Sequence, residues 1–321
     1  MKILVTGGAG FIGSNVCEAL IKRGDHVHCL DNFITGKSEN LNAVHDHPNF
    51  TFFEGDIRSL ETCQNAIKGC EAVIHLAALG SVPRSIDDPL TANSINISGF
   101  LNVIESARTQ NIQRFIFAAS SSTYGDSPSL PKIEDNIGKP LSPYAVGKYV
   151  NELYAHVYHL NYGLSYVGLR YFNVFGKNQD PNGAYAAVIP KFIDAYFHGQ
   201  TPTINGDGTT TRDFTHVNNV VSATLQALDN KNQEKDNEIY NVAFGQQTSL
   251  VELTTLIRNE LQSRFVDRAF DAPIYGPSRQ GDIQHSYASI EKIKKAFGYE
   301  PKVDLKEGIR LTVDWFLSSK T

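Results

Sequence analysis

Short, mostly apolar runs alternate with amphipathic stretches along the first half of the chain. The runs occupy residues 3–5, 27–30, 51–53, 73–76, 115–119 and 165–169. Runs of this length with few polar positions are typical of strands that are covered on both faces. Apolar residues at helical spacing, such as Ile12, Val16 and Leu20, fill the first interval. The pattern therefore predicts an α/β fold, a doubly wound parallel sheet with right-handed crossovers.

Two of the predicted helices carry longer apolar stripes. The stripes consist of Ile97, Leu101 and Ile104 in a helix at about residues 89–108, and of Val146, Val150, Leu153 and Val157 in the next helix. An apolar stripe at this spacing marks the face that a helix buries. Both helices are long enough to bury such a face.

The regular alternation ends after Arg170. Segments rich in Asn, Gly, Pro and aromatic residues follow at 173–185 and 199–214, and mixed helices and short strands come after them. This change predicts a Rossmann-type domain at residues 1–172, to which the chain returns at about 214–245, and a smaller C-terminal substrate-binding domain at residues 173–321. Ligands of open parallel sheets bind beyond the carboxyl ends of the strands, so we expect the site in a cleft there.

A glycine-rich turn directly follows the first predicted strand. Gly8, Gly10 and Gly13 satisfy the spacing G-x-G-x-x-G, and Gly7 with the last two also satisfies G-x-x-G-x-x-G. Glycines there let backbone N–H groups approach phosphate at a helix N-terminus. The second strand ends at Asp31, whose carboxylate can accept hydrogen bonds from ribose hydroxyls, and no basic residue follows at once. The sequence therefore predicts a dinucleotide site that favours NAD over NADP.

Composition argues against several other classes of protein. Of the 321 residues, 41% are hydrophobic and 20% are charged, which is ordinary for a globular protein. The net charge is −5 and Lys and Arg do not cluster, so nucleic acid is not an expected partner. The first strand begins at residue 2, and no apolar stretch approaches the roughly 20 residues that span a bilayer. We therefore expect a cytoplasmic protein without a membrane partner.

The cysteines and histidines do not form a metal-binding pattern. Four cysteines lack C-x-x-C spacing and are expected to be reduced and packed as small apolar side chains: Cys17, Cys29, Cys63 and Cys70. Two H-x-H pairs, at residues 26–28 and 45–47, have no acid or thiol cluster nearby, and we interpret them as exposed histidines. Neither a disulfide nor a metal is expected.

A serine-rich strand end and a tyrosine–lysine pair are the candidate catalytic groups. Ser120, Ser121 and Ser122 follow the fifth apolar run, and Tyr144 and Lys148 open a later predicted helix. Residues four apart lie on one helical face. A free tyrosine, with a pKa of about 10, is a poor base at neutral pH, but a lysine ammonium and a nicotinamide cation beside it favour the tyrosinate. The spacing Y-x-x-x-K alone is weak evidence, and the glycine motif strengthens it.

Together these motifs resemble the extended short-chain dehydrogenase/reductase family. The resemblance covers nearly the whole chain and rests on TGGAGFIG at residues 6–13, HLAA at 75–78, SSSTYG at 120–125, the pair Tyr144 and Lys148, and RYFNVFG at 170–176. Residues 138–148, 180–190 and 204–208 are most similar to bacterial UDP-N-acetylglucosamine 4-epimerases, some of which prefer the corresponding uronic acids. The resemblance implies an NAD-binding first domain and a UDP-sugar-binding second domain.

The resemblance also assigns site residues. Contacts with NAD would fall on Gly7, Gly10, Phe11, Ile12 and Gly13 at the pyrophosphate, Asp31 and Asn32 at the ribose, Asp56 and Ile57 at the adenine, and Ala77, Ala78, Asn96, Tyr144 and Lys148 near the nicotinamide. Contacts with the UDP-sugar would fall on Asn173, Ala187, Val188 and Lys191 along the nucleotide, Asn205 near uracil, Arg212 and Arg279 on the diphosphate, and Ser121 and Ser122 beside Ser120 at the sugar. Ser286 matches a gate that is small in epimerases that accept an acetamido group and tyrosine in those restricted to glucose and galactose.

The implied reaction is 4-epimerisation of UDP-N-acetylglucosamine through a 4-keto sugar. Hydride leaves C4 for NAD and returns to the other face, while Tyr144 takes the hydroxyl proton and Ser120 hydrogen-bonds the same oxygen. Related dehydratases and decarboxylases have Asp or Glu at the serine-rich strand end, and serine is a poor acid for elimination. The alternatives are a 4-epimerase of UDP-hexuronic acids or of UDP-glucose, and a non-catalytic nucleotide-binding module. The resemblance also implies a homodimer, in which the two long helices pack against their copies in a four-helix bundle.

Overall fold

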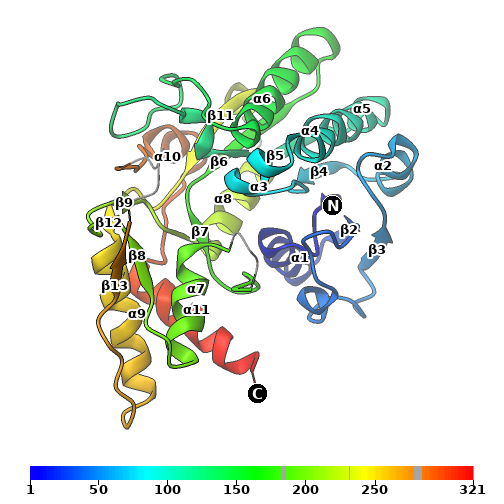
Figure 1. Ribbon diagram of the computed structural model, residues 1–321. Helices are drawn as coiled ribbons and strands as arrows, with labels where there is room; N and C mark the ends of the chain where they lie inside the picture. Colours follow the sequence, from blue (N-terminus) through cyan, green and yellow to red (C-terminus); the bar gives the residue numbers. More distant parts are fainter. Residues whose placement is uncertain (183–185, 231, 278–283, 321) are drawn as a thin grey trace.

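A seven-stranded parallel sheet forms the centre of the molecule (Figure 1). The computed structural model describes residues 1–182, 186–230, 232–277 and 284–320. The strands of the sheet are β1 (Lys2–Thr6), β2 (His26–Asp31), β3 (Phe50–Glu54), β4 (Ala72–His75), β5 (Arg114–Ser120), β6 (Tyr166–Tyr171) and β11 (Glu238–Val242). They lie in the order β3-β2-β1-β4-β5-β6-β11, and all neighbouring pairs are parallel. The predicted doubly wound sheet is confirmed, and the six apolar runs coincide with β1 to β6.

Helices cover both faces of this sheet, which is why its central strands are mainly apolar. One face packs against α1 (Phe11–Arg23), α8 (Val217–Asp229) and α10 (Glu291–Phe297). The other packs against α2 (Leu60–Ala66), α5 (Phe100–Thr109) and α6 (Pro143–Tyr162). β11 joins the sheet beside β6, where the chain was expected to return, and the domain boundary at residue 172 stays a prediction.

The helix predicted at about residues 89–108 has a widened turn at its centre. It consists of α4 (Pro89–Asn93), a π-helical segment (Ser94–Gly99) and α5. Within the widened turn, the Asn96 side chain accepts from Leu79 N at 2.7 Å and donates to Leu79 O at 3.1 Å. π-Helical turns of this kind often accompany functional sites. The periodicity of apolar residues predicted the helix and gave no sign of the π turn.

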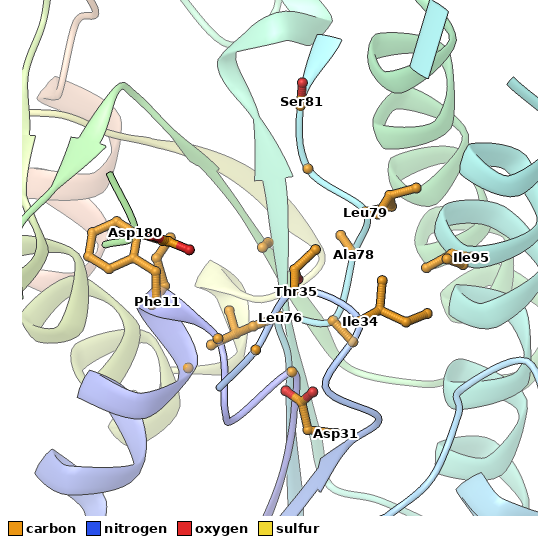
Figure 2. Close-up of a pocket in the computed structure, with 18 of the residues that line it drawn as sticks. Phe11, Asp31, Ile34, Thr35, Leu76, Ala78, Leu79, Ser81, Ile95 and Asp180 are labelled. Atoms are coloured by element: carbon orange, nitrogen blue, oxygen red, sulfur yellow. The ribbon is translucent and has the colours of Figure 1, made fainter. Parts of the chain in front are cut away.

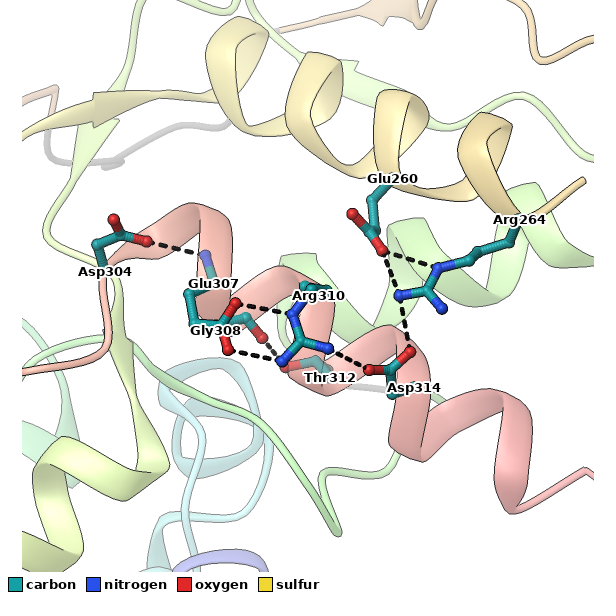
Figure 3. Close-up of polar contacts among 8 residues, drawn as sticks. All are labelled: Glu260, Arg264, Asp304, Glu307, Gly308, Arg310, Thr312 and Asp314. Carbon is teal, nitrogen blue, oxygen red and sulfur yellow. Dashed lines mark hydrogen bonds and ion pairs between the residues drawn. The ribbon is translucent and has the colours of Figure 1, made fainter.

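A second core lies to one side of the sheet, at lower left in Figure 1. Its helices are α7 (Val188–Phe197), α9 (Leu250–Arg264) and α11 (Leu305–Ser318). The short strands pair as β7 (Val174–Phe175) with β10 (Thr215–His216), β8 (Thr203–Asn205) with β13 (Ile274–Gly276), and β9 (Thr211–Arg212) with β12 (Thr248–Ser249). Where α9 meets α11, Arg264 and Arg310 both pair with Asp314, and each also binds a glutamate of its own helix (Figure 3).

The cysteines pack as expected, and one histidine does not. Three of the four free thiols are buried, and Cys70 is half-buried. His45 and His47 are exposed, but the expectation was wrong for His28, which is half-buried with Nδ1 2.7 Å from Ala66 O and its ring against Phe53. The hydrogen bond to the carbonyl and the ring contact compensate the burial of the imidazole. Within the part of the chain that the structure describes, no three His, Cys, Asp or Glu side chains gather at a metal-binding distance, and every helix is too short or too polar to cross a membrane.

Candidate active site

A cavity of about 780 Å³ opens beyond the carboxyl ends of the strands, where the strand order reverses between β1 and β4 (Figure 2). Its walls come from the loops that follow β1 to β4, from Ile95, from the end of β5, from the start of α6, and from residues between 171 and 180 together with Ala186 and Ala187. Figure 2 shows Asp31 at the end of β2, with Leu76, Ala78, Leu79 and Ser81 along the loop after β4. This is the position at which open parallel sheets bind ligands.

The glycine turn after β1 leaves space that no other residue would leave. Gly7 has a φ of +71°, and a Cβ at Gly13 would lie 2.1 Å from the Gly7 carbonyl oxygen. Gly10 is the N-cap of α1 and has no side chain that could cap the helix. The first N–H groups of α1 are therefore available to an anion in the cavity, which suits a pyrophosphate.

Asp31 organises the loop that follows β2. Its Oδ2 accepts from Ala9 N at 2.9 Å and its Oδ1 from Phe33 N at 2.8 Å. Burial raises the pKa of this carboxyl group, and the backbone hydrogen bonds oppose the rise. Each carboxylate oxygen keeps a second lone pair, so the group can still accept from ribose hydroxyls. The cavity, the glycine turn and this carboxylate together fit a dinucleotide.

The predicted adenine end contains a fixed carboxylate. Asn32 Nδ2 donates to Asp56 Oδ2 at 2.8 Å, and Arg58 Nη2 donates to the same oxygen at 2.6 Å. The Arg58 hydrogen bonds hold the pKa of Asp56 below its usual range although burial opposes them. Asp56 and Ile57 both line the cavity. Asn96 does not, and it acts on the loop after β4 through its pairing with Leu79.

The candidate catalytic groups meet at the end of β5. Ser142 caps α6 and Pro143 occupies its first turn, so Tyr144 and Lys148 project from the start of this helix. Tyr144 N also donates to Ser85 Oγ of α3 (Val82–Asp87) at 3.0 Å. Lys148 Nζ donates to Ala118 O at 2.7 Å and lies 6.0 Å from the centre of the Tyr144 ring. Tyr144 and Lys148 thus line the cavity together with Ser120, as the sequence predicted.

Burial dominates the proton affinities of these groups. It raises the pKa of Tyr144, and a hydrogen bond with Ser120 opposes the rise. It lowers the pKa of Lys148 to about 8, opposed by the charge of Glu152. The chain by itself therefore favours neutral Tyr144. A neighbouring positive charge, such as that of the Lys148 ammonium, would oppose this preference.

The serines after β5 form a chain that ends at Ser120. Ser121 and Ser122 belong to a short 3₁₀ helix (Ser121–Tyr124), and Ser122 Oγ donates to Ser120 Oγ at 2.9 Å. Neither of them lines the cavity, whereas Ser120 does. The Ser122 hydrogen bond uses a lone pair of Ser120 Oγ, so the Ser120 proton stays available as a donor on the side of Tyr144.

The predicted substrate residues fall into two groups. Asn173 and Ala187 line the cavity. Five others do not, and they lie on α7, on β8, on β9 and after residue 283: Val188, Lys191, Asn205, Arg212 and Ser286. Arg212 and Ser286 lie on neighbouring segments, because Ser286 N donates to Thr211 O at 3.2 Å. Arg279 lies outside the described residues.

Asp213 joins these substrate segments, and the sequence gave no sign of it. The carboxylate is fully buried and accepts from Phe244 N, Gly245 N and Ala288 N at 3.0 to 3.2 Å. Its backbone oxygen accepts from Asn173 Nδ2 at 3.2 Å. Burial raises the pKa of Asp213 to about 7, and the backbone hydrogen bonds oppose the rise. Asp213 therefore links the segments that carry Asn173, Arg212 and Ser286.

An ion pair beside the cavity was also missed. Lys37, in the loop after β2, pairs with Asp180 at 2.8 Å, and both residues line the cavity. Lys177, which precedes Asp180 by three residues, pairs with Glu18 of α1 at 2.6 Å. The two ion pairs connect residues 177–180 to α1 and to the loop after β2. The only signal in the sequence is charge, which does not identify partners so far apart.

Comparisons with known proteins agree with this geometry. Residues 3–243 match the NAD dependent epimerase/dehydratase family. A UDP-glucose 4-epimerase from Mycolicibacterium smegmatis is 36% identical over 98% of both chains. A UDP-N-acetylglucosamine 4-epimerase from Methanobrevibacter ruminantium, solved with UDP-N-acetylmuramic acid, is 40% identical, with a TM-score of 0.92 over 99% of this chain and 98% of that one. A UDP-glucuronic acid 4-epimerase from Bacillus cereus, solved with UDP-glucuronic acid and NAD, is 32% identical, with a TM-score of 0.89 over 99% and 100%.

The fold and the cavity define a dinucleotide-binding enzyme of the Rossmann class. The chain belongs to the NAD dependent epimerase/dehydratase family, part of the extended short-chain dehydrogenases/reductases. Its cofactor is NAD, in agreement with Asp31 at the end of β2.

Proposed function

We propose that this protein is an NAD-dependent 4-epimerase of UDP-sugars whose preferred substrate is UDP-N-acetylglucosamine. The observation that carries the proposal is the convergence of Ser120, Tyr144 and Lys148 on the cavity that contains the glycine turn. The relatives that act on UDP-sugars support the reaction. The small side chain of Ser286 and the 40% identical N-acetylglucosamine epimerase support the acetamido sugar.

Each catalytic group has a defined task in this proposal. NAD, when bound, accepts the hydride from C4 of the sugar and returns it. Tyr144 Oη takes the proton of the C4 hydroxyl group and later gives it back. Ser120 Oγ donates a hydrogen bond to the same oxygen, and the Lys148 ammonium favours the tyrosinate. The predicted cofactor residues between Gly7 and Ala78 in the first domain hold NAD. Arg212 in the second domain holds the diphosphate of the UDP-sugar.

The end of β5 argues against elimination chemistry. A dehydratase must protonate a departing hydroxyl group, for which a carboxylic acid is suited and a serine is not. Residues 120–122 are all serine, so this strand end supplies no acid. Withdrawal and return of hydride need none, and they leave NAD in its original oxidation state.

The first test is a nuclear magnetic resonance assay with UDP-N-acetylglucosamine and no added NAD. We expect the anomeric signals of the galacto epimer to appear, because the cofactor is regenerated in every turnover. The same assay with UDP-glucose and with the UDP-hexuronic acids separates the alternative substrates. Faster conversion of UDP-glucose or of a UDP-hexuronic acid would show that this sugar, rather than UDP-N-acetylglucosamine, is the preferred substrate. If none of these sugars were converted, a non-catalytic nucleotide-binding module would be favoured.

We also propose that two copies of the chain associate through α6. The stripe of Val146, Leu153 and Val157 is 45–47% exposed, although the sequence pattern predicts that it buries a face. The buried face of α6 is a different one, and it includes Lys148, Glu152 and Ala155. Ile86 of α3 and Leu90 of α4 are 59% and 82% exposed. A second copy of these helices would cover this apolar surface, as in a four-helix bundle.

Leu153→Asp is expected to convert the dimer to a monomer. A carboxylate in the centre of the proposed helix contact would be buried without a partner, which association cannot compensate. Light scattering measures the mass directly. Val266→Asp is the matched control, because Val266 is 77% exposed and lies beyond the end of α9. A Leu153→Asp variant of unchanged mass would contradict the proposed interface.

A further inference from the structure

A buried ion pair lies directly behind the candidate catalytic groups. Arg170 of β6 donates to both carboxylate oxygens of Glu152 in α6, with Nε to Oε1 at 2.9 Å and Nη2 to Oε2 at 2.7 Å. The two residues are only 3% and 6% exposed. Glu152 lies one helical turn after Lys148, so both occupy the same face of α6.

Neighbouring groups supply further contacts to the Arg170 guanidinium of this ion pair. Arg170 Nη1 donates to Glu134 O at 2.8 Å, and the guanidinium lies 4.8 Å from the centre of the Tyr124 ring. The Glu134 carboxylate accepts from Asn241 N at 2.9 Å. A bidentate pair with these further contacts has a fixed geometry. Glu152 is therefore held against β6 and cannot turn to form a direct ion pair with Lys148.

The charges alternate from the cavity inward. Lys148 is positive, Glu152 is negative and Arg170 is positive, and Lys148 is only 2% exposed. A buried ammonium without a nearby negative charge tends to lose its proton. Glu152 supplies this charge, while the fork of Arg170 keeps the carboxylate from neutralising the ammonium by direct contact.

The other titratable groups around these residues do not provide the same charge. From β4, His75 faces Lys148, but burial lowers the pKa of His75 to about 3 and keeps it neutral. From α6 itself, Tyr144 is neutral as well, because burial raises its pKa. Tyr124 and Tyr166 lie around Arg170 and Glu152, and burial raises the pKa of each to about 12. Burial also raises the pKa of Glu134, the carboxyl group on the far side of Arg170.

We propose that Glu152 and Arg170 are positioning residues that keep Lys148 protonated and correctly placed to activate Tyr144. The inference rests on the proposed function, in which Lys148 stabilises the tyrosinate. Its physical basis is the geometry of the pair, and the opposing effects of burial and Glu152 on the pKa of Lys148 agree with it. Without the carboxylate, Lys148 loses its charge near neutral pH, and Tyr144 then loses the favourable interaction of its phenolate.

The test measures the protonation of Lys148 without requiring turnover. Trace labelling with acetic anhydride over a pH series, read by mass spectrometry of the Lys148 peptide, gives the midpoint of its deprotonation. In Glu152→Gln we expect this midpoint to fall by about one pH unit. Glu105→Gln is the matched control, because Glu105 also pairs with an arginine, Arg108, and accepts from Tyr158 of α6 at 3.1 Å. It should leave the Lys148 midpoint unchanged.

A double variant protects the test against loss of folding. Glu152→Gln leaves Arg170 buried without its carboxylate, whereas Glu152→Leu with Arg170→Met removes both charges at similar volume, a change that folded proteins often tolerate. The Lys148 midpoint should fall in the double variant too, because Glu152 lies one helical turn from Lys148 on α6, whereas Arg170 lies on β6 and contacts the carboxylate of Glu152. Epimerisation at pH 7 should fall about twofold in both variants, because a midpoint lowered by one unit from about 8 leaves about half of Lys148 protonated at that pH. The alkaline limb of the activity should move to lower pH by the same amount.

The outcomes separate this inference from the proposed function. A normal Lys148 midpoint in the folded double variant, with an active parent enzyme, would overturn the inference alone. A shifted midpoint in a protein that turns over no UDP-sugar would overturn the proposed function and leave the electrostatic coupling standing.

Discussion

Tyr144→Phe is expected to abolish epimerisation while leaving the fold and bound NAD intact. The change removes one oxygen atom from a half-buried side chain at the start of α6. That oxygen is the group proposed to take the C4 hydroxyl proton, and general acid–base catalysis of this kind contributes about 10²–10⁴-fold to a rate. We expect a loss at the upper end of this range, because neither Ser120 nor Lys148 can replace the base. Serine is too weak, and the Lys148 ammonium is a donor that has no free lone pair.

The measurement is the rate at which the anomeric signals of the product epimer appear when the enzyme is incubated with the preferred UDP-sugar. Tyr158→Phe is the matched control, since Tyr158 is on the same helix and its hydroxyl group contacts Glu105 rather than the cavity. Nucleotide released on heat denaturation shows whether the variant still holds NAD. Activity within a few-fold of the parent would mean that another group accepts the proton.

The parts of the site that the sequence predicted are local in the chain. Ile3, Leu4 and Val5 are fully buried, so β1 had to be apolar throughout, and this made the strand visible as a pattern. The glycine turn and Asp31 belong to the same β-α-β unit, in which residue spacing alone determines which groups meet. Tyr144 and Lys148 are one helical turn apart. Each of these predictions depends on secondary structure and on nothing further away.

The parts that escaped prediction depend on contacts between distant segments. Lys37 with Asp180, Asp213 with Ala288 and Arg170 with Glu152 join elements that the sequence does not show to be neighbours. A charged residue in the sequence indicates that a partner exists, not which residue it is. The assignments of Asn205, Arg212 and Ser286 came from family resemblance for the same reason. Their place in the second core could not be worked out from residue spacing.

The apolar stripe of α6 shows a different limit. Its periodicity predicts a buried face, and the single chain leaves Leu153 and Val157 nearly half exposed. An apolar stripe in a sequence marks side chains that are buried, and the pattern is the same whether they are buried within one chain or between two copies. The interior face of α6 is instead partly polar, because it carries Lys148, which we propose acts in catalysis, and Glu152. The proposed function of the inner face and the proposed association through the outer face would together explain this reversal.

Gly13→Ala is expected to weaken NAD binding strongly and to destabilise the first domain. The new Cβ would lie 2.1 Å from Gly7 O and 2.8 Å from Gly8 Cα, so only backbone movement could relieve the contact. Forced overpacking of this kind costs about 1–3 kcal/mol of the free energy of unfolding. The displaced backbone is the turn that we propose binds the pyrophosphate, so the same movement would remove N–H groups from the cavity. Bound nucleotide after purification and thermal unfolding measure the two effects.

Gly147→Ala provides the control for adding a methyl group to a helix glycine. Its Cβ would meet Asn96 Cβ at 3.5 Å and Ile97 Cγ1 at 3.6 Å, which are ordinary van der Waals contacts. Alanine also favours a helix interior over glycine by about 0.5–1 kcal/mol, so this variant should be as stable as the parent or slightly more stable. If Gly13→Ala kept its nucleotide as well as Gly147→Ala does, the turn after β1 would not be the phosphate cradle. The dinucleotide would then have to be held by Asp31 and the loop after β4.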